Sequence, residues 1–144
     1  MAWRIRYHRK MLITLLNIPS ALRIQSYSRT AIEYGGLTYS YQPFDPGPLA
    51  EASDLGDDRF DLRLRTKAPT VAGETIGEWL RRTKGAIGTP IRLLIFDVAS
   101  GQLPSDASLI HRGTRSITKA SMGATDCILS IGSLSAPLDA WVGL

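Results

Sequence analysis

The residues that most often carry out catalysis or bind metal ions are few in this sequence, and they stand apart from one another. The two histidines, His8 and His111, are not near a cysteine or a carboxylate at a spacing that a metal site requires. The single cysteine, Cys127, stands in the apolar stretch TDCILSI, which indicates a small buried residue. No G-x-S-x-G or comparable motif supports a Ser-His-Asp set. The sequence therefore predicts that the protein is not an enzyme, and a small hydrolase is the least favoured class.

Sites for phosphate or calcium are not indicated either. The stretch GAIG at 85–88 is followed by Thr89-Pro90 and a strand pattern, so it lacks the helix N-terminus that binds phosphate. The acidic residues Asp54, Asp57 and Asp58 do not follow the spacing of a calcium loop. No catalytic, metal-binding or cofactor-binding residue is assigned, and no cofactor is expected.

The first ten residues carry charge equal to the whole net charge of the chain, which is +4. The bases are Arg4, Arg6, Arg9 and Lys10. The segment WRIRYHRK interleaves them with Trp3 and Tyr7, a mixture that binds single-stranded nucleic acid by phosphate neutralisation and base stacking. The rest of the chain is neutral overall, whereas nucleic-acid-binding proteins usually carry a basic stripe across the fold itself. Binding of single-stranded nucleic acid by a small β-barrel is therefore the alternative interpretation.

Between Asp45 and Asp58 the charge is reversed, because five acidic residues occur there with no base. A positive arm and a negative loop are complementary between copies, and contacts between two different patches build a ring or a filament. We therefore predict an interface with two sides. The basic side comprises Trp3, Arg4, Arg6, Arg9 and Lys10, and the acidic side comprises Asp54, Asp57 and Asp58. An arm and a loop that are both solvated and never meet is the other reading that the sequence allows.

Length and composition indicate one globular domain. The chain has 144 residues, of which 44% are hydrophobic and 21% charged, as in ordinary globular proteins. No apolar run approaches the ~20 residues that span a bilayer, and no clean cleavage site follows the short apolar stretch at 11–18, so neither a membrane span nor a signal peptide is expected. A single cysteine cannot form an intrachain disulfide, which fits a reducing compartment. The predicted organisation is a basic arm at 1–11 and a single β-barrel-like domain at 12–144.

Alternating apolar and polar residues predict about eight strands. In TAIEYGGLTYSYQPF, residues 30–44, the Gly35-Gly36 pair predicts a two-residue hairpin turn between strands at 31–34 and 37–41. The stretch RFDLRLRT at 59–66 alternates strictly and is the clearest strand. The other predicted strands are at 12–18, 21–27, 90–99, 108–112, 114–120 and 125–133.

One helix is predicted at 73–84, where Ile76, Trp79 and Leu80 share a face and Gly85 follows the last turn. We expect Trp79 to lie in the core with that face. The whole pattern predicts a mainly β fold: an antiparallel β-barrel or sandwich of about eight strands, with one α-helix packed on it or plugging one end. The apolar tail APLDAWVGL is expected to dock on this body.

Part of the sequence resembles phage minor tail proteins, the β-barrel hub and baseplate proteins of the tail tip. The similar stretch runs from ALRI through TAIEYGGLTYSYQPF and an acidic loop to DRFDLRLR. The family pattern gG-x-x-Y-x-x-x-x-F matches Gly35, Gly36, Tyr39 and Phe44. The later GETIGEWLRRTKGAIGTPIRLLIFDV is similar to the family's next step, a helix followed by a strand. Together these stretches cover residues 12–99.

The resemblance implies a non-enzymatic structural protein of the virion tail, made in the host cytoplasm. Such a subunit would form a threefold or sixfold homo-oligomeric ring, or an adaptor, around the tail channel. Its partners would be tube, hub and baseplate proteins, with DNA only as the transiting genome. Larger hub relatives often carry a second barrel or a C-terminal extension, so the resemblance leaves the roles of hub and adaptor open. It assigns no catalytic residues.

Overall fold

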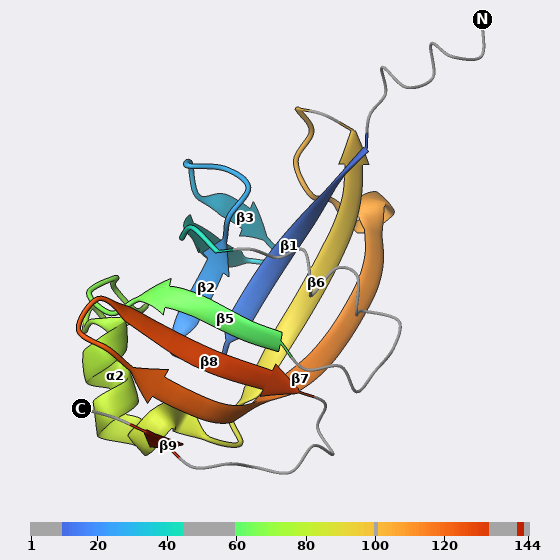
Figure 1. Cartoon of the computed structure of the whole chain (residues 1–144). Helices are drawn as coiled ribbons and strands as arrows, with labels where there is room; N and C mark the ends of the chain where they lie inside the picture. Colours follow the sequence, from blue (N-terminus) through green and yellow to red (C-terminus); the bar gives the residue numbers. More distant parts are fainter. Residues whose placement is uncertain (1–9, 45–59, 100, 133–140, 143–144) are drawn as a thin grey trace, which may run out of the picture.

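A computed structural model describes residues 10–44, 60–99, 101–132 and 141–142, which form a nine-stranded sheet with one α-helix (Figure 1). The strands are β1 (Lys10–Ile18), β2 (Leu22–Gln25), β3 (Ile32–Tyr34), β4 (Leu37–Tyr41), β5 (Phe60–Arg65), β6 (Pro90–Ala99), β7 (Leu109–Met122), β8 (Asp126–Gly132) and β9 (Trp141–Val142), and the helix is α2 (Ile76–Thr83). The mainly β fold with one helix is confirmed.

The sheet is open and folds over on itself. Its strand order is β3-β4-β2-β1-β6-β7-β8-β5, with β9 beside β7, so β3 and β5 are its two edges among the described residues. Figure 1 shows β5 and β8 crossing the layer of β1 and β6 at a wide angle. Of the two predicted architectures, a sandwich-like open sheet fits the described part of the chain, and a closed barrel does not.

The long strand β7 joins the two crossed halves. It has 14 residues, where the sequence predicted two separate strands at 108–112 and 114–120. Gly113 lies within the ladder opposite Leu93, so it does not interrupt the strand. The pairing register shifts between Ile95 and Phe96 on one side and between Ile117 and Lys119 on the other. Such irregularities bend and twist a strand, which lets β7 pair with β6 in one half and with β8 in the other.

Two strand pairs are parallel, which corrects the prediction of an antiparallel sheet. Ile24 of β2 lies opposite Ser40 of β4, and β9 runs parallel to β7. The connection after β2 turns around the buried side chain of Gln25. Its Oε1 accepts hydrogen bonds from the backbone N–H groups of Tyr27 and Ser28 at 2.8 and 2.7 Å, and its Nε2 donates to the Ser28 carbonyl at 2.6 Å. This turn sends the chain through β3 first, so β4 returns beside β2 in the same direction.

The larger apolar core lies between the crossed halves of the sheet. Leu62 and Leu64 of β5 point into it, as the strict alternation predicted, and Cys127 of β8 is also buried there. The helix α2 closes one end through Ile76, Trp79 and Leu80, which confirms the predicted apolar face and the core position of Trp79.

The helix α2 is shorter than the predicted 73–84 because Thr75 caps it. The Thr75 hydroxyl accepts a hydrogen bond from the Glu78 backbone N–H at 3.1 Å, and the Glu78 carboxylate accepts one from the Thr75 N–H at 2.9 Å. This reciprocal capping box fixes the first turn. At the other end Lys84, with φ 54°, takes the left-handed cap conformation one residue before the predicted Gly85.

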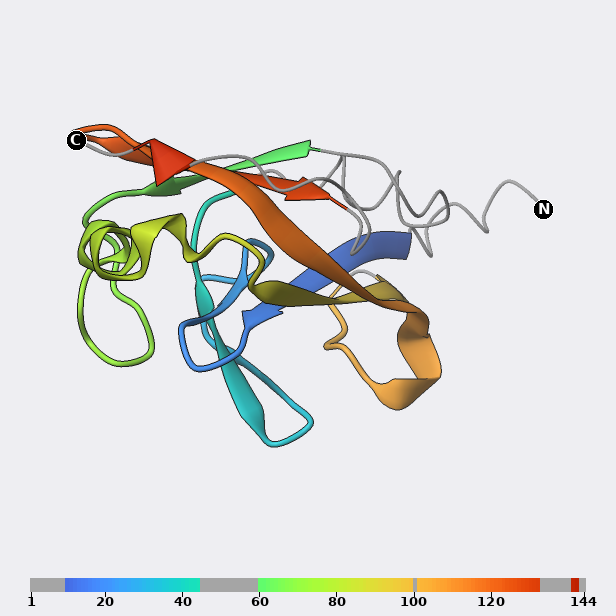
Figure 2. The ribbon, with the colours of Figure 1, turned by 90° about the horizontal axis from the view of Figure 1, so that it is seen from below.

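The β3–β4 hairpin covers the opposite face of β1 and β6, as Figure 2 shows with β5 and β8 on the other side. Gly35 and Gly36 have φ values of 61° and 79°, which a two-residue primed turn requires. A second, smaller core lies under the hairpin and contains Ile13, Leu15, Ile32, Tyr39, Phe96 and Val98. The predicted hairpin is thus confirmed.

Candidate functional site

Most of the residues predicted to form an interface lie outside the described residues. These are Trp3, Arg4, Arg6 and Arg9 of the arm and Asp54, Asp57 and Asp58 of the acidic loop. Lys10 is the exception. It begins β1 opposite Ala99 of β6, so it belongs to the sheet.

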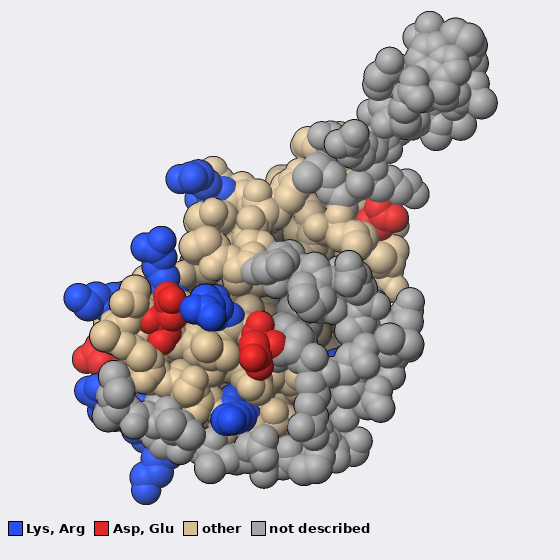
Figure 3. All heavy atoms as spheres, in the orientation of Figure 1, with Lys and Arg blue, Asp and Glu red and all other residues tan. Residues whose placement is uncertain are grey.

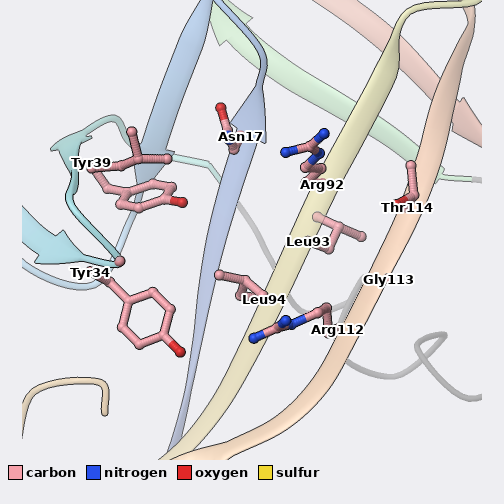
Figure 4. Close-up of a pocket in the computed structure, with 11 residues that line it drawn as sticks. Asn17, Tyr34, Tyr39, Arg92, Leu93, Leu94, Arg112, Gly113 and Thr114 are labelled. Atoms are coloured by element: carbon pink, nitrogen blue, oxygen red, sulfur yellow. The ribbon is translucent and has the colours of Figure 1, made fainter. Parts of the chain in front are cut away.

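A cleft of about 460 Å³ opens between the β3–β4 hairpin and the face of the sheet that the hairpin covers. We call it the arginine cleft. The residues that line it come from the hairpin (Tyr34, Leu37, Tyr39), from β1 (Asn17), from β6 (Arg92, Leu93, Leu94) and from β7 (Arg112, Thr114). Figure 4 shows the two tyrosine rings on one side and the two guanidinium groups on the other, reaching toward the tyrosines.

Strand register explains why cationic side chains gather here. Asn17 of β1 pairs with Arg23 of β2 on one side and with Arg92 of β6 on the other. Thr114 of β7 lies next in the row, opposite Arg92. Directly cross-strand residues point to the same face of a sheet, about 4.8 Å from strand to strand. One row across four strands therefore places Arg23 on one side of Asn17 and Arg92 on the other. Asn17 and Arg92 line the arginine cleft, whereas Arg23 lines a neighbouring hollow beside β4.

Two polar atoms of this row have no hydrogen-bond partner among the described residues. Asn17 is only 8% exposed, and its Oδ1 is buried without a partner; the Nε of Arg23 is buried and unpartnered as well. Buried polar groups in folded proteins are nearly always paired, so these atoms can accept a partner from water or from a ligand. Among the residues that the structure describes, no ion pair joins Arg23, Arg92 or Arg112 to a carboxylate.

The two tyrosines of the hairpin remain protonated beside these cations. The bond that Tyr34 donates to Asp106 raises the pKa of Tyr34, and nearby Arg112 opposes that shift. Burial raises the pKa of Tyr39, with Arg23 and Arg92 acting in the opposite direction. The cleft therefore combines neutral hydroxyl groups with unpaired guanidinium groups, which suits an anionic ligand.

The face of the molecule that carries β5 is different in character. Figure 3 shows lysine and arginine side chains interspersed there with aspartate and glutamate. Arg63 of β5, for example, pairs with Asp126 of β8 at 3.3 Å. Such surface pairs neutralise one another, and each contributes little to stability.

His111 and Cys127, the described histidine and cysteine, occupy ordinary positions in the fold. His111 of β7 is half-buried, and its Nε2 lacks a hydrogen-bond partner. Cys127 is buried, with its Sγ 3.3 Å from Thr66 Oγ1. In the described ranges, no group of three His, Cys, Asp or Glu residues is arranged to hold a metal ion. No described helix is long and apolar enough to cross a membrane.

The arginine cleft was not predicted from the sequence. Asn17, Arg92 and Arg112 stand far apart in the chain, and each arginine lies in a strand where a charged residue is expected to face solvent. Only the pairing of β1, β6 and β7 brings them together, and that pairing is not encoded in local spacing.

Comparison with known proteins adds no identification. The chain matches no family model, and no curated protein matches it.

Proposed function

We propose that this chain is a structural subunit of a phage tail tip or baseplate, acting through protein–protein contacts as a ring or an adaptor around the tail channel. The resemblance across residues 12–99 motivates the proposal. The observation that supports it best is the hairpin, where each of the four matching positions has a structural role.

Gly35 and Gly36 supply the positive φ angles of the turn. Tyr39, 2% exposed, anchors the hairpin in the smaller core, and Phe44 packs against the larger one. The motif thus describes one folded unit, a hairpin fixed to both cores. The later part of the resemblance corresponds to α2 followed by β6.

The edges of the sheet offer surfaces for assembly. In the described part of the chain, β5 has a strand partner on only one side, and so does β3. The outward residues of β5 are Asp61, Arg63 and Arg65, all exposed. Charged side chains on an edge strand discourage indiscriminate pairing, while an edge still accepts a strand from a specific partner. The predicted arm and acidic loop would add contacts between copies.

Native mass spectrometry and electron microscopy of the purified protein, alone and with candidate tube, hub and baseplate proteins, test the proposal. We expect a ring of three or six copies or a defined mixed complex. Deletion of residues 1–9, which stops before β1 begins at Lys10, should leave a folded protein that assembles more weakly. A protein that stays monomeric and joins none of these partners would contradict the proposal.

The same deletion distinguishes the proposed function from the alternative, binding of single-stranded nucleic acid. If the arm binds single-stranded nucleic acid, filter binding of the full chain should weaken with salt, with a slope that corresponds to about three or four phosphate contacts. Deletion of residues 1–9 should then abolish binding without affecting assembly.

A further inference from the structure

We propose that the arginine cleft binds carboxylates, and that the acidic segment 45–58 of a second copy of this chain supplies them. The inference deepens the proposed function, and it rests on that proposal only for the premise that copies of the chain contact one another. The site itself is defined by the described residues of β1, β3, β4, β6 and β7.

The two cations of the cleft project from neighbouring strands of the sheet. The guanidinium groups of Arg92 and Arg112 reach from the sheet toward the hairpin (Figure 4), and no described carboxylate forms an ion pair with either. A guanidinium group presents parallel N–H donors that match the two oxygens of a carboxylate. Because these side chains project from a folded framework, less ordering is needed on binding than for a flexible chain.

An unpartnered acceptor in the cleft favours a peptide over a phosphodiester. Arg92 and Arg112 offer N–H donors to carboxylate oxygens. The buried Oδ1 of Asn17 is an acceptor, and it needs a donor from the ligand. The backbone N–H groups of a peptide supply donors beside its carboxylates, whereas a phosphodiester group has acceptors only.

The walls of the cleft favour the same occupant. Leu37 and Leu94 line it together with the polar groups. Its volume lies within the range of about 300–1,000 Å³ typical of ligand sites. The segment 45–58, DPGPLAEASDLGDD, places Leu49 and Leu55 among its acidic residues. It can therefore offer both apolar side chains and carboxylates.

Charge distribution makes the segment complementary to the rest of the chain. The segment carries five acidic residues and no base, and the whole chain has a net charge of +4, so the remaining residues carry +9. A contact between this segment in one copy and the cleft in another joins two different surfaces. Such heterologous contacts propagate from copy to copy and close into a ring when the rotation permits.

Mixing two complementary variants tests the contact. The first variant, Arg92→Gln/Arg112→Gln, removes the cations of the cleft; both side chains are exposed, so the fold should be retained. The second variant replaces Asp45, Glu51, Asp54, Asp57 and Asp58 by their amides. In analytical ultracentrifugation, wild type should self-associate, more weakly as salt rises. Each variant alone should be monomeric, and an equimolar mixture should form a heterodimer through the one intact cleft and the one intact segment.

A matched control removes the same charge elsewhere. Arg81→Gln/Lys119→Gln neutralises two exposed cations that do not line the cleft, and it should self-associate like wild type. The inference is overturned if wild type remains monomeric, if either cleft or segment variant self-associates like wild type, or if the mixture does not associate. A purified chain that stays monomeric yet enters complexes with tail proteins would overturn this inference and leave the proposed function standing.

A second experiment identifies the ligand class. A synthetic peptide of residues 45–58 is titrated into the acid-neutralised variant, followed by amide chemical shifts. We expect saturable binding centred on β1, β6 and the hairpin, and a dissociation constant about tenfold or more higher when Arg92 and Arg112 are also replaced. Inorganic phosphate and an oligothymidylate should displace the peptide only weakly. If either ligand binds more tightly than the peptide, the carboxylate assignment is wrong.

Discussion

Tyr34 of β3 donates its phenolic hydrogen to Oδ1 of Asp106, and the two oxygens lie 2.6 Å apart. The residues are 72 positions apart in the chain, and Asp106 begins the short 3-10 helix Asp106–Ser108 between β6 and β7. Tyr34 also packs edge-on against Phe96, with ring centroids 4.9 Å apart. The bond therefore links the hairpin to the β6–β7 connection beside the arginine cleft.

Tyr34→Phe should destabilise the protein near neutral pH and have less effect at alkaline pH. The bond to Asp106 raises the pKa of Tyr34, so the folded protein holds this proton more tightly than the unfolded chain does. The stabilisation is complete below the ordinary tyrosine pKa of about 10 and is lost as pH rises through the raised value. Melting temperatures of wild type and Tyr34→Phe, recorded between pH 7 and 11, measure this pH-dependent loss of stability.

Tyr27→Phe is the control, because no hydrogen bond from its hydroxyl group is seen within the described residues. It should lower the melting temperature less than Tyr34→Phe at pH 7. If the difference in melting temperature between wild type and Tyr34→Phe stays constant up to pH 11, the hydrogen bond to Asp106 is not the cause of the destabilisation.

Gly35→Val should cost about 1–2 kcal/mol of unfolding free energy, whereas Gly35→Asn should cost much less. Gly35 has a φ of 61°, and no atom beyond its chain neighbours lies within 4 Å of where a Cβ would stand. The penalty therefore comes from the backbone, and asparagine tolerates this conformation better than a β-branched residue. Urea unfolding measures both variants. Equal stability of the two would argue against a left-handed turn.

Local features of the fold were predictable because the residues that determine them are close in sequence. The hairpin follows from its glycine pair, and the buried face of β5 follows from strict alternation. The helix start could have been placed correctly as well, since Thr75 and Glu78 form a T-x-x-E signature. The prediction of two strands in place of β7 was wrong because of Gly113. In sequence, a glycine that pairs within a strand ladder looks the same as one that ends a strand.

Features that depend on long-range pairing were not predictable. The parallel alignment of β2 and β4 depends on Gln25, whose buried amide organises the following turn. A glutamine at the end of a strand carries no sequence signal of that role. The arginine cleft depends on the register of β1, β6 and β7, so Asn17 and Arg92 could not be placed together from their positions in the chain.

Cys127 should resist alkylation in the folded protein. Its side chain is buried, and burial raises the pKa of the thiol, so little of the reactive thiolate forms at pH 8. Alkylation then requires local or global unfolding that exposes the thiol. Its rate should therefore rise with urea concentration in parallel with unfolding. Mass spectrometry of iodoacetamide-treated protein follows the reaction. Rapid modification without denaturant would show that the β8 region opens readily.

Gly77→Ala in α2 should destabilise the protein, although alanine is the better helix former by about 1 kcal/mol. A Cβ at this position would lie 2.5 Å from Thr66 Cγ2 and 3.1 Å from Met122 Sδ. The helix lies close to the turn after β5, where the Gly77 N–H donates to the Thr66 carbonyl at 2.9 Å. The clash should outweigh the gain in propensity, for a net loss of about 1–3 kcal/mol in urea unfolding.

Combining Thr66→Ser with Gly77→Ala tests whether the contact with Thr66 causes this loss of stability. Thr66→Ser removes the methyl group that the new Cβ would meet and keeps the hydroxyl group that donates to the Gly123 carbonyl at 3.0 Å. The double variant should therefore recover part of the loss, which appears as a favourable coupling energy in a double-mutant cycle. Recovery is expected to be incomplete, because the Thr66 carbonyl oxygen would still lie 3.3 Å from the Cβ. Strict additivity of the two substitutions would mean that α2 shifts away from β5 and does not stay packed against Thr66.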